Sequence, residues 1–170
     1  PPFESPYPLT NSVGTNLRAT ARSGTRAVAV VGNPNAGKST LFNALTGANQ
    51  PVGNWAGVTV DREVMLLEHR GIEMAVVDLP GVYSLAPSTR DEEVTRDHVL
   101  DGRVELFVNV LDASNLERNL YLTVQLLEMG VPMVVALNMV DTAREHGIEI
   151  DPRALSAQLG CPVIEVTASK

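Results

Sequence analysis

Eight consecutive residues, 32–39, read G-N-P-N-A-G-K-S and fit the phosphate-loop pattern G-x-x-x-x-G-K-[ST]. The two glycines allow a tight turn and a close approach of the backbone to a ligand. The loop amides would then face a nucleoside polyphosphate, with Lys38 at the β- and γ-phosphates and Ser39 on Mg²⁺. We therefore predict a nucleotide site formed by Gly32, Asn33, Pro34, Asn35, Ala36, Gly37, Lys38, Ser39 and Thr40.

The stretches on either side of this loop support the prediction. The apolar run 27–31 precedes it, and the helix-like stretch 39–45 follows it. A strand, a loop and a helix in this order form the context in which the pattern binds phosphate. The alternative is a glycine-rich turn with a Lys-Ser pair by chance, and the agreement of motif and context disfavours it.

A second element, Asp78-Leu79-Pro80-Gly81, directly follows the apolar stretch 72–77. An acid at a strand end near the phosphate loop can orient Mg²⁺ through its water shell, so Asp78 is a candidate for that role. Gly81 can offer its amide to a γ-phosphate. The D-x-x-G pattern is weak alone and becomes specific after a phosphate loop. The alternative is a turn that ends the strand, which Pro80-Gly81 would also satisfy.

The third element, Asn138-Met139-Val140-Asp141, also follows a predicted strand and fits the N-x-x-D pattern that reads guanine. The Asp141 carboxylate can accept from the N1–H and the 2-amino group together, a donor pair that adenine lacks, so it favours GTP over ATP. Asn138 would bridge the phosphate loop and the base. The alternative is that Asp141 caps a helix. The stretch Thr167-Ala168-Ser169 resembles the S-A element whose amide touches the guanine 6-oxygen.

Residues 51–59 lie between the first predicted helix and the second predicted strand, which is the place of a first switch segment. Thr59 is the expected Mg²⁺ ligand that also senses the γ-phosphate, and Gly57 and Val58 would lie beside the nucleotide. Thr46 is a weaker candidate because it belongs to the end of the helix. The single tryptophan, Trp55, has the alternative role of a loop aromatic that shields the core.

Composition indicates one globular domain with its own core: 170 residues, of which 44% are apolar. The net charge of −7 and the absence of a Lys/Arg block disfavour a broad nucleic-acid surface. The single cysteine, Cys161, excludes an internal disulfide framework and is interpreted as a packing residue. No stretch has the length of a membrane span or of a secretory signal. We therefore expect a soluble, cytosolic domain.

From residue 27 onward, predicted strands alternate with predicted helices, which indicates a parallel sheet covered on both faces. Strands are expected over 27–31, 60–67, 72–77, 104–111, 132–138 and 162–166, the second and third as a hairpin, and helices over 38–46, 90–100, 115–129 and 152–159. Residues 1–26 are expected to form a flexible arm or linker. The prediction is an α/β phosphate-loop NTPase of the Ras-like G-domain type, with a mostly parallel six-stranded sheet over residues 27–170.

Two of the predicted helices carry specific end signals. Ser114 is expected to cap the third helix, with Glu117 completing a capping box. Leu116, Leu120, Val124 and Leu127 are expected to form its buried face. In the fourth helix, Asp151 is the predicted cap, Pro152 takes the first turn and Gly160 ends it.

Several of these motifs together resemble the N-terminal G domain of the ferrous iron transporter FeoB family. They are G-N-P-N-A-G-K-S, G-N-W-A-G-V-T, D-L-P-G-V-Y-S-L, Asp91-Glu92-Glu93-Val94 and N-M-V-D, and the resemblance extends from about residue 27 to residue 170. Met139 is usual in that family at a position where other G domains carry lysine. Ala56 stands where family members often carry proline.

The resemblance implies a GTP-hydrolysing switch on the cytoplasmic side of a prokaryotic inner-membrane Fe²⁺ transporter, with GTP or GDP as ligand and Mg²⁺ as cofactor. It also implies a following helical domain, a transmembrane region and, as an open possibility, a homo-oligomer. The closing helix after the base-reading loop is expected to be missing, so that the G domain is incomplete at its C-terminal end. No nucleic-acid partner is expected.

Hydrolysis needs an explanation, because Val82 occupies the position after D-x-x-G where many small GTPases have a water-orienting glutamine. The family resemblance implies a K⁺ ion held by Asn35 and by the backbone carbonyls of Gly53 and Trp55, which would offset charge on the phosphates. Asn35 has the alternative of a turn residue after Pro34. The predicted catalytic groups are Asn35, Lys38, Thr59 and Gly81, and turnover is expected to be slow and K⁺-stimulated.

Two other functions use the same loops. One is a ribosome-assembly or tRNA-modifying GTPase, which the acidic composition disfavours. The other is a nucleotide-dependent interaction module with negligible turnover, which the apolar Val82 leaves open.

Overall fold

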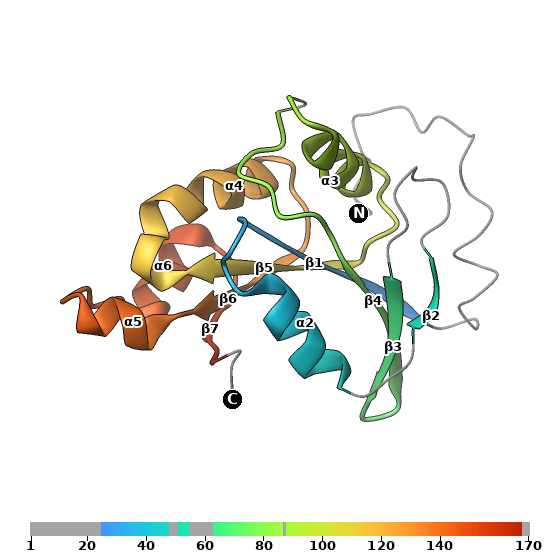
Figure 1. Ribbon diagram of the computed structural model, residues 1–170, viewed down its shortest axis with the longest axis horizontal. Helices are drawn as coiled ribbons and strands as arrows, with labels where there is room; N and C mark the ends of the chain where they lie inside the picture. Colours follow the sequence, from blue (N-terminus) through green and yellow to red (C-terminus); the bar gives the residue numbers. More distant parts are fainter. Residues whose placement is uncertain (1–24, 48–50, 55–62, 87, 168–170) are drawn as a thin grey trace.

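The structure, a computed structural model, describes residues 25–47, 51–54, 63–86 and 88–167 (Figure 1). Nearly all of the predicted arm lies outside these residues, as do Trp55, Gly57, Val58, Thr59, Ala168 and Ser169. Among the described residues, no helix combines the length and the apolar composition needed to cross a membrane.

The described strands form one seven-stranded sheet in the order β2-β3-β4-β1-β5-β6-β7. Strands β4, β1, β5, β6 and β7 are parallel to one another, and β3 and β2 are added antiparallel at one edge. The bounds are β1 Arg26–Gly32, β2 Pro51–Asn54, β3 Glu63–His69, β4 Ile72–Asp78, β5 Leu106–Asp112, β6 Met133–Asn138 and β7 Val163–Glu165.

All six predicted strands are present, and β2 is a seventh that was expected to be loop. It pairs only with β3 at the sheet edge and begins at Pro51, a position where a missing N–H costs a strand least. The β3–β4 hairpin is confirmed. Arg70 and Gly71 both adopt positive φ, 52° and 79°, as the twist-compatible two-residue turn requires.

The helices are α2 Lys38–Thr46, α3 Arg90–Leu100, α4 Leu116–Glu128, α5 Val140–Glu145 and α6 Pro152–Leu159. They cover both faces of the sheet, as predicted (Figure 1). On one face, Leu41 and Phe42 of α2 pack with Val28 and Val30 of β1. On the other face, residues from α3, α4 and α5 pack with Ala29 and Val31.

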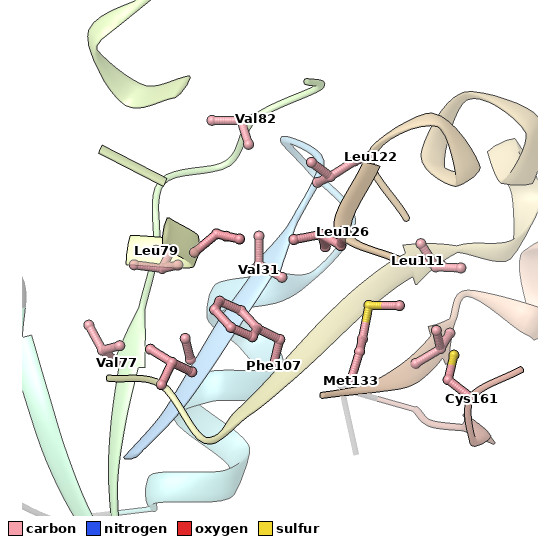
Figure 2. Packing of buried hydrophobic residues seen from close by; sticks show 14 of the residues in the cluster. Val31, Val77, Leu79, Val82, Phe107, Leu111, Leu122, Leu126, Met133 and Cys161 are labelled. Atoms are coloured by element: carbon pink, nitrogen blue, oxygen red, sulfur yellow. The ribbon is translucent and has the colours of Figure 1, made fainter. Parts of the chain in front are cut away.

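The larger core cluster lies on the α4 side of the sheet, where Phe107, Leu111, Leu122 and Leu126 are almost completely buried (Figure 2). Cys161 belongs to this cluster, and burial raises the pKa of its thiol. The prediction that Cys161 is a packing residue is therefore confirmed.

Two predictions about α4 are wrong. A 3₁₀ turn, Ala113–Asn115, precedes the helix, and the carboxylate of Asp112 accepts the Ser114 N–H at 2.8 Å, so Ser114 is not the cap and no capping box forms with Glu117. The fully buried residues of the helix are Asn119, Leu122, Thr123 and Leu126. Of the predicted face, Leu116, Leu120 and Leu127 are partly buried against the core cluster, whereas Val124 is 45% exposed. Asn119 and Thr123 are polar, so apolar periodicity alone does not identify the fully buried face of the helix.

The end signals predicted for α6 are confirmed. Asp151 accepts the Arg153 N–H, Pro152 occupies the first turn of α6, and Gly160 ends it in the left-handed conformation. A capping box does occur at α3, between Thr89 and Glu92.

Candidate functional site

The phosphate loop connects β1 to α2 and depends on its two glycines. A Cβ on Gly32 would lie 2.5 Å from the Val110 carbonyl oxygen of β5. Gly37 has a φ of 90°, and a Cβ there would lie 2.2 Å from Nδ2 of Asn138. A side chain at Gly32 would collide with the backbone of β5, and one at Gly37 would collide with the side chain of Asn138 at the end of β6, so the loop lies directly against both strand ends.

The side chains of Lys38, Ser39 and Asp78 meet at the start of α2. Lys38 Nζ donates to Asp78 Oδ1 at 2.6 Å, and Ser39 Oγ donates to Asp78 Oδ2 at 3.0 Å. Lys38 is buried, whereas Ser39 is exposed. Strand β4, parallel to β1, delivers the carboxylate, because Val30 of β1 is in register with Asp78.

This cluster fits a hard divalent cation. A serine hydroxyl and a carboxylate oxygen 3.0 Å apart are the oxygen donors that Mg²⁺ prefers, directly or through its waters. Thr59, the third predicted Mg²⁺ residue, lies outside the described residues. The weaker candidate, Thr46, is buried and its Oγ1 donates to the Phe42 carbonyl at 2.8 Å, so it faces the helix and not the cluster.

The segment after Asp78 runs back along the phosphate loop. Val82 N–H donates to the Gly32 carbonyl at 3.2 Å, and a Cβ on Gly81 would lie 3.1 Å from Pro34 Cα. Gly81 therefore touches the loop, where its lack of a side chain permits the approach. Val82 is 3% exposed and belongs to the core cluster (Figure 2). Its side chain has a packing role.

The predicted base-reading residues lie at the end of β6. Asn138 is buried, and its Nδ2 donates to the Ala36 carbonyl at 3.0 Å, joining this strand end to the phosphate loop. Met139 adopts a φ of 58° and precedes α5. Asp141 is exposed in the first turn of α5, and its Oδ1 accepts the Thr142 N–H at 2.9 Å. Thr167 is exposed beyond β7.

The helix-cap alternative for Asp141 is only partly met. The N-cap of α5 is Met139, which has no side-chain cap bond, so Asp141 lies inside the helix. Its carboxylate bonds a first-turn amide and stays exposed on the same side of the fold as the strand ends.

The remaining described site residues lie on the phosphate loop, α2 and β2. Asn35 is exposed with a φ of 66°, and Thr40 is exposed on α2. Gly53 lies in β2.

The sequence did not reveal that polar side chains also connect the phosphate loop to α4. Asn33 is buried, and its Nδ2 donates to the Arg118 carbonyl at 3.3 Å. Asn109, in the middle of β5, donates to Thr123 Oγ1 at 2.8 Å. The sequence signal for these contacts is the polar Asn109 inside the apolar run 104–111, because a buried polar side chain needs a hydrogen-bond partner. Thr123, in the polar stripe of α4, is that partner.

Together, the parallel sheet, the glycine-dependent loop and the acid at the end of β4 define a phosphate-loop nucleotide-binding domain of the G-domain class. A family model described as ferrous iron transport protein B matches residues 26–170. The chain belongs to this family.

Similar proteins agree with this assignment. The chain is 52% identical over 147 residues to the Fe(2+) transporter FeoB of Shigella flexneri, covering 84% of this chain and 19% of that protein. It therefore spans about a fifth of the length of the curated relatives it matches.

Solved structures of the family have the same fold. The cytosolic domain of L. pneumophila FeoB is 50% identical, with a TM-score of 0.78 over 84% of this chain and 57% of that one. A mutant of S. thermophilus NFeoB bound to GDP is 47% identical, with a TM-score of 0.77 over 85% and 56%. The FeoB G domain from Methanococcus jannaschii is 44% identical, with a TM-score of 0.75 over 86% and 88%.

Proposed function

We propose that this chain binds GTP and hydrolyses it to GDP and phosphate, as the nucleotide-controlled domain of a ferrous iron transporter. The observation that carries the proposal is the meeting of Lys38, Ser39 and Asp78 at the phosphate loop, with Asn138 bonded to the same loop from β6. Phosphate-binding and base-reading elements then share one site at the carboxyl ends of the parallel strands.

Each residue has a distinct task in this proposal. Lys38 exchanges the Asp78 carboxylate for β- and γ-phosphate oxygens, and the loop amides of 33–38 hold the remaining phosphate charge. Ser39 and Thr59 would hold Mg²⁺, with Asp78 acting through its waters. The ion supplies charge neutralisation between the β- and γ-phosphates. The Gly81 amide would donate to the γ-phosphate from its position against Pro34.

The attacking water is not oriented by the residue after Gly81, because the Val82 side chain is buried in the core. The proposal therefore assigns charge stabilisation in part to K⁺, held by the amide oxygen of Asn35 and by the carbonyls of Gly53 and Trp55. The exposed side chain of Asn35 lies on the loop beside the predicted phosphates. We expect turnover to be slow and to rise in K⁺.

Guanine selectivity is assigned to Asp141, whose exposed carboxylate can accept two hydrogen bonds from one base edge. Asn138 holds this strand end against the loop, Met139 turns the backbone into α5, and Thr167, Ala168 and Ser169 would line the far side of the base. The alternative of an interaction module that binds without turnover differs only in the rate of hydrolysis.

The larger setting is also a proposal. The relatives are about five times longer than the matched region, which supports a helical domain and a transmembrane iron-permease region in the same protein. The domain would then act at the cytoplasmic face of the membrane, with homo-oligomers as a further possibility. The net charge of −7 supports a role without nucleic acid and so disfavours an RNA-directed GTPase.

The test is GTP binding by calorimetry and single-turnover hydrolysis in the 170-residue chain and in Lys38→Ala. We expect Lys38→Ala to weaken GTP binding at least about 100-fold, since each charged hydrogen bond contributes roughly 1.5–3 kcal/mol and the lysine meets two phosphates. Arg96→Ala removes an exposed cation on α3 and is the matched control. Wild-type affinity in Lys38→Ala would overturn the site, and binding without turnover would favour the interaction module.

A further inference from the structure

The segment that carries Gly81 is anchored at three backbone N–H groups. Leu79 and Val82 donate to the β1 carbonyls of Val30 and Gly32, at 3.0 and 3.2 Å. Leu85 donates instead to a side chain, the Oε1 of Gln125 on α4, at 2.8 Å. The third anchor therefore comes from a different element than the first two.

Gln125 is well placed to act as a fixed acceptor. Its partner is an N–H, so the atom that faces Leu85 must be the amide oxygen. Its neighbour Leu126 and the preceding Leu122 are completely buried, and in Figure 2 they point from α4 towards the core around Val31. The helix that carries Gln125 is thus held in place by packing in the core cluster, to which Leu79, Val82 and Leu85 of the segment also belong.

The same helix also contacts the phosphate loop. The Arg118 carbonyl accepts from Asn33 Nδ2 at 3.3 Å, and the Arg118 guanidinium lies 4.0 Å from the centre of the Tyr83 ring. Helix α4 therefore holds both the loop that would bind the phosphates and the segment that would sense the γ-phosphate. Arg118 contributes to both contacts.

We propose that Gln125 is a positioning residue for γ-phosphate recognition. By accepting the Leu85 N–H, it holds the far end of segment 79–86 on α4 and so keeps Gly81 against Pro34, where its amide meets the third phosphate. The inference rests on the proposed function. It predicts that loss of Gln125 weakens the binding of GTP alone, because GDP has no γ-phosphate and does not use Gly81.

The test compares dissociation constants for GDP and for a non-hydrolysable GTP analogue in the 170-residue chain. Gln125→Met keeps the length and removes the acceptor, and Gln125→Glu keeps an acceptor oxygen. Gln158→Met makes the same change at an exposed site on α6. We expect Gln125→Met to weaken the analogue about 3- to 10-fold relative to GDP, Gln125→Glu to restore most of this loss, and Gln158→Met to change neither constant.

Other results separate the possible failures. If Gln125→Met leaves the ratio of the two dissociation constants unchanged, including by weakening the binding of both nucleotides equally, the positioning role is overturned and only a structural one is left. A wild-type chain that binds neither nucleotide would overturn the proposed function, and this inference with it. If Gln125→Met does not fold, Gln125→Leu replaces it in the comparison of dissociation constants. The exchange rate of the Leu85 amide in Gln125→Glu then tests the hydrogen bond itself. Rapid exchange of that amide in the wild-type chain would also contradict the anchor.

Discussion

Asp78 is the central residue of the site, because its two carboxylate oxygens accept hydrogen bonds from Lys38 and Ser39 together. In the proposed function, phosphate oxygens would compete with this carboxylate for the Lys38 ammonium, and Mg²⁺ would compete with the Ser39 proton for the serine oxygen. Binding of a nucleotide therefore has to replace a charge-assisted contact with others of the same kind, which makes the net gain smaller than the number of phosphate contacts suggests. A metal ion lowers this cost because it gives the displaced carboxylate a new positive partner.

Asp141→Asn tests the base-reading role at the scale of one functional group. We expect weaker GTP binding, by roughly 10- to 100-fold, because the asparagine amide cannot accept from both guanine donors. XTP should gain relative to GTP, since xanthine carries a carbonyl where guanine carries its 2-amino group. Competition calorimetry measures both affinities. Glu145→Gln, an exposed change on the same helix, is the control, and an unchanged GTP-to-XTP preference would contradict the role of Asp141.

Asn35 tests the cation proposal, and its backbone conformation decides which variants are informative. Its φ of 66° lies in the left-handed region, where alanine is strained and glycine is not. Asn35→Gly therefore removes the amide oxygen without backbone strain, and Asn35→Asp keeps an oxygen donor. We expect K⁺ to accelerate GTP hydrolysis over Na⁺ in the native chain and in Asn35→Asp, and not in Asn35→Gly.

The measurement is the single-turnover rate against K⁺ concentration, with GTP affinity determined in parallel. Lys38 and the loop amides remain in every variant, so nucleotide binding should change little. Equal rates in K⁺ and Na⁺ for the native chain would refute the cation proposal.

At the scale of elements, local signals predicted most of the fold. The bounds of α2, α3 and α6 agree with the expected 38–46, 90–100 and 152–159, because each has a clear start or stop signal in the chain. The errors have physical causes. Asn119 and Thr123 put polar groups on the buried face of α4, where β5 and the start of the helix itself supply their hydrogen-bond partners. The short α5 has no capping side chain, and β2 forms only because β3 offers an edge.

Helix α3 contains a titratable group that should make its packing sensitive to acid. His98 is 2% exposed, and its Nδ1 lies 2.8 Å from the Val94 carbonyl. Burial lowers its pKa below the ordinary value of 6.5, an effect that the Val94 bond, Asp97 and Asp101 partly oppose and Arg103 slightly reinforces. Below pH 6.5 the unfolded chain therefore binds more protons than the folded one.

The free energy of unfolding should consequently fall as the pH drops from about 7.5 to 5.5. His98→Gln cannot take up the proton, so its stability should fall less over the same range. Urea unfolding at several pH values measures the difference, with the exposed His146→Gln as control. Parallel pH curves for the native chain and His98→Gln would show that His98 does not contribute.

At the scale of the whole molecule, the site exists only when distant strand ends meet. Ala36 and Asn138 are 102 residues apart in sequence and share a hydrogen bond, and Lys38 and Asp78 are 40 apart. The sequence could predict that the three described motifs lie close together, because each follows its own strand and the carboxyl ends of parallel strands meet at one edge of the sheet. It could not predict the ion pair, the packing of Val82 or the contacts of α4, since these depend on the register of β1 with β4 and β5.

Because the site is assembled from β1, β4 and β6, a nucleotide that binds it should stabilise the chain as a unit. GDP at 100 times its dissociation constant adds about 2.7 kcal/mol to the free energy of unfolding. For a domain of this size, that predicts a rise of roughly 5–11 °C in the midpoint of thermal unfolding. Scanning calorimetry with GDP, with ADP and without nucleotide measures the shift. Lys38→Ala should lose the GDP shift while Arg96→Ala keeps it. An equal shift with ADP would contradict guanine selectivity, because the phosphate loop alone would then account for the binding.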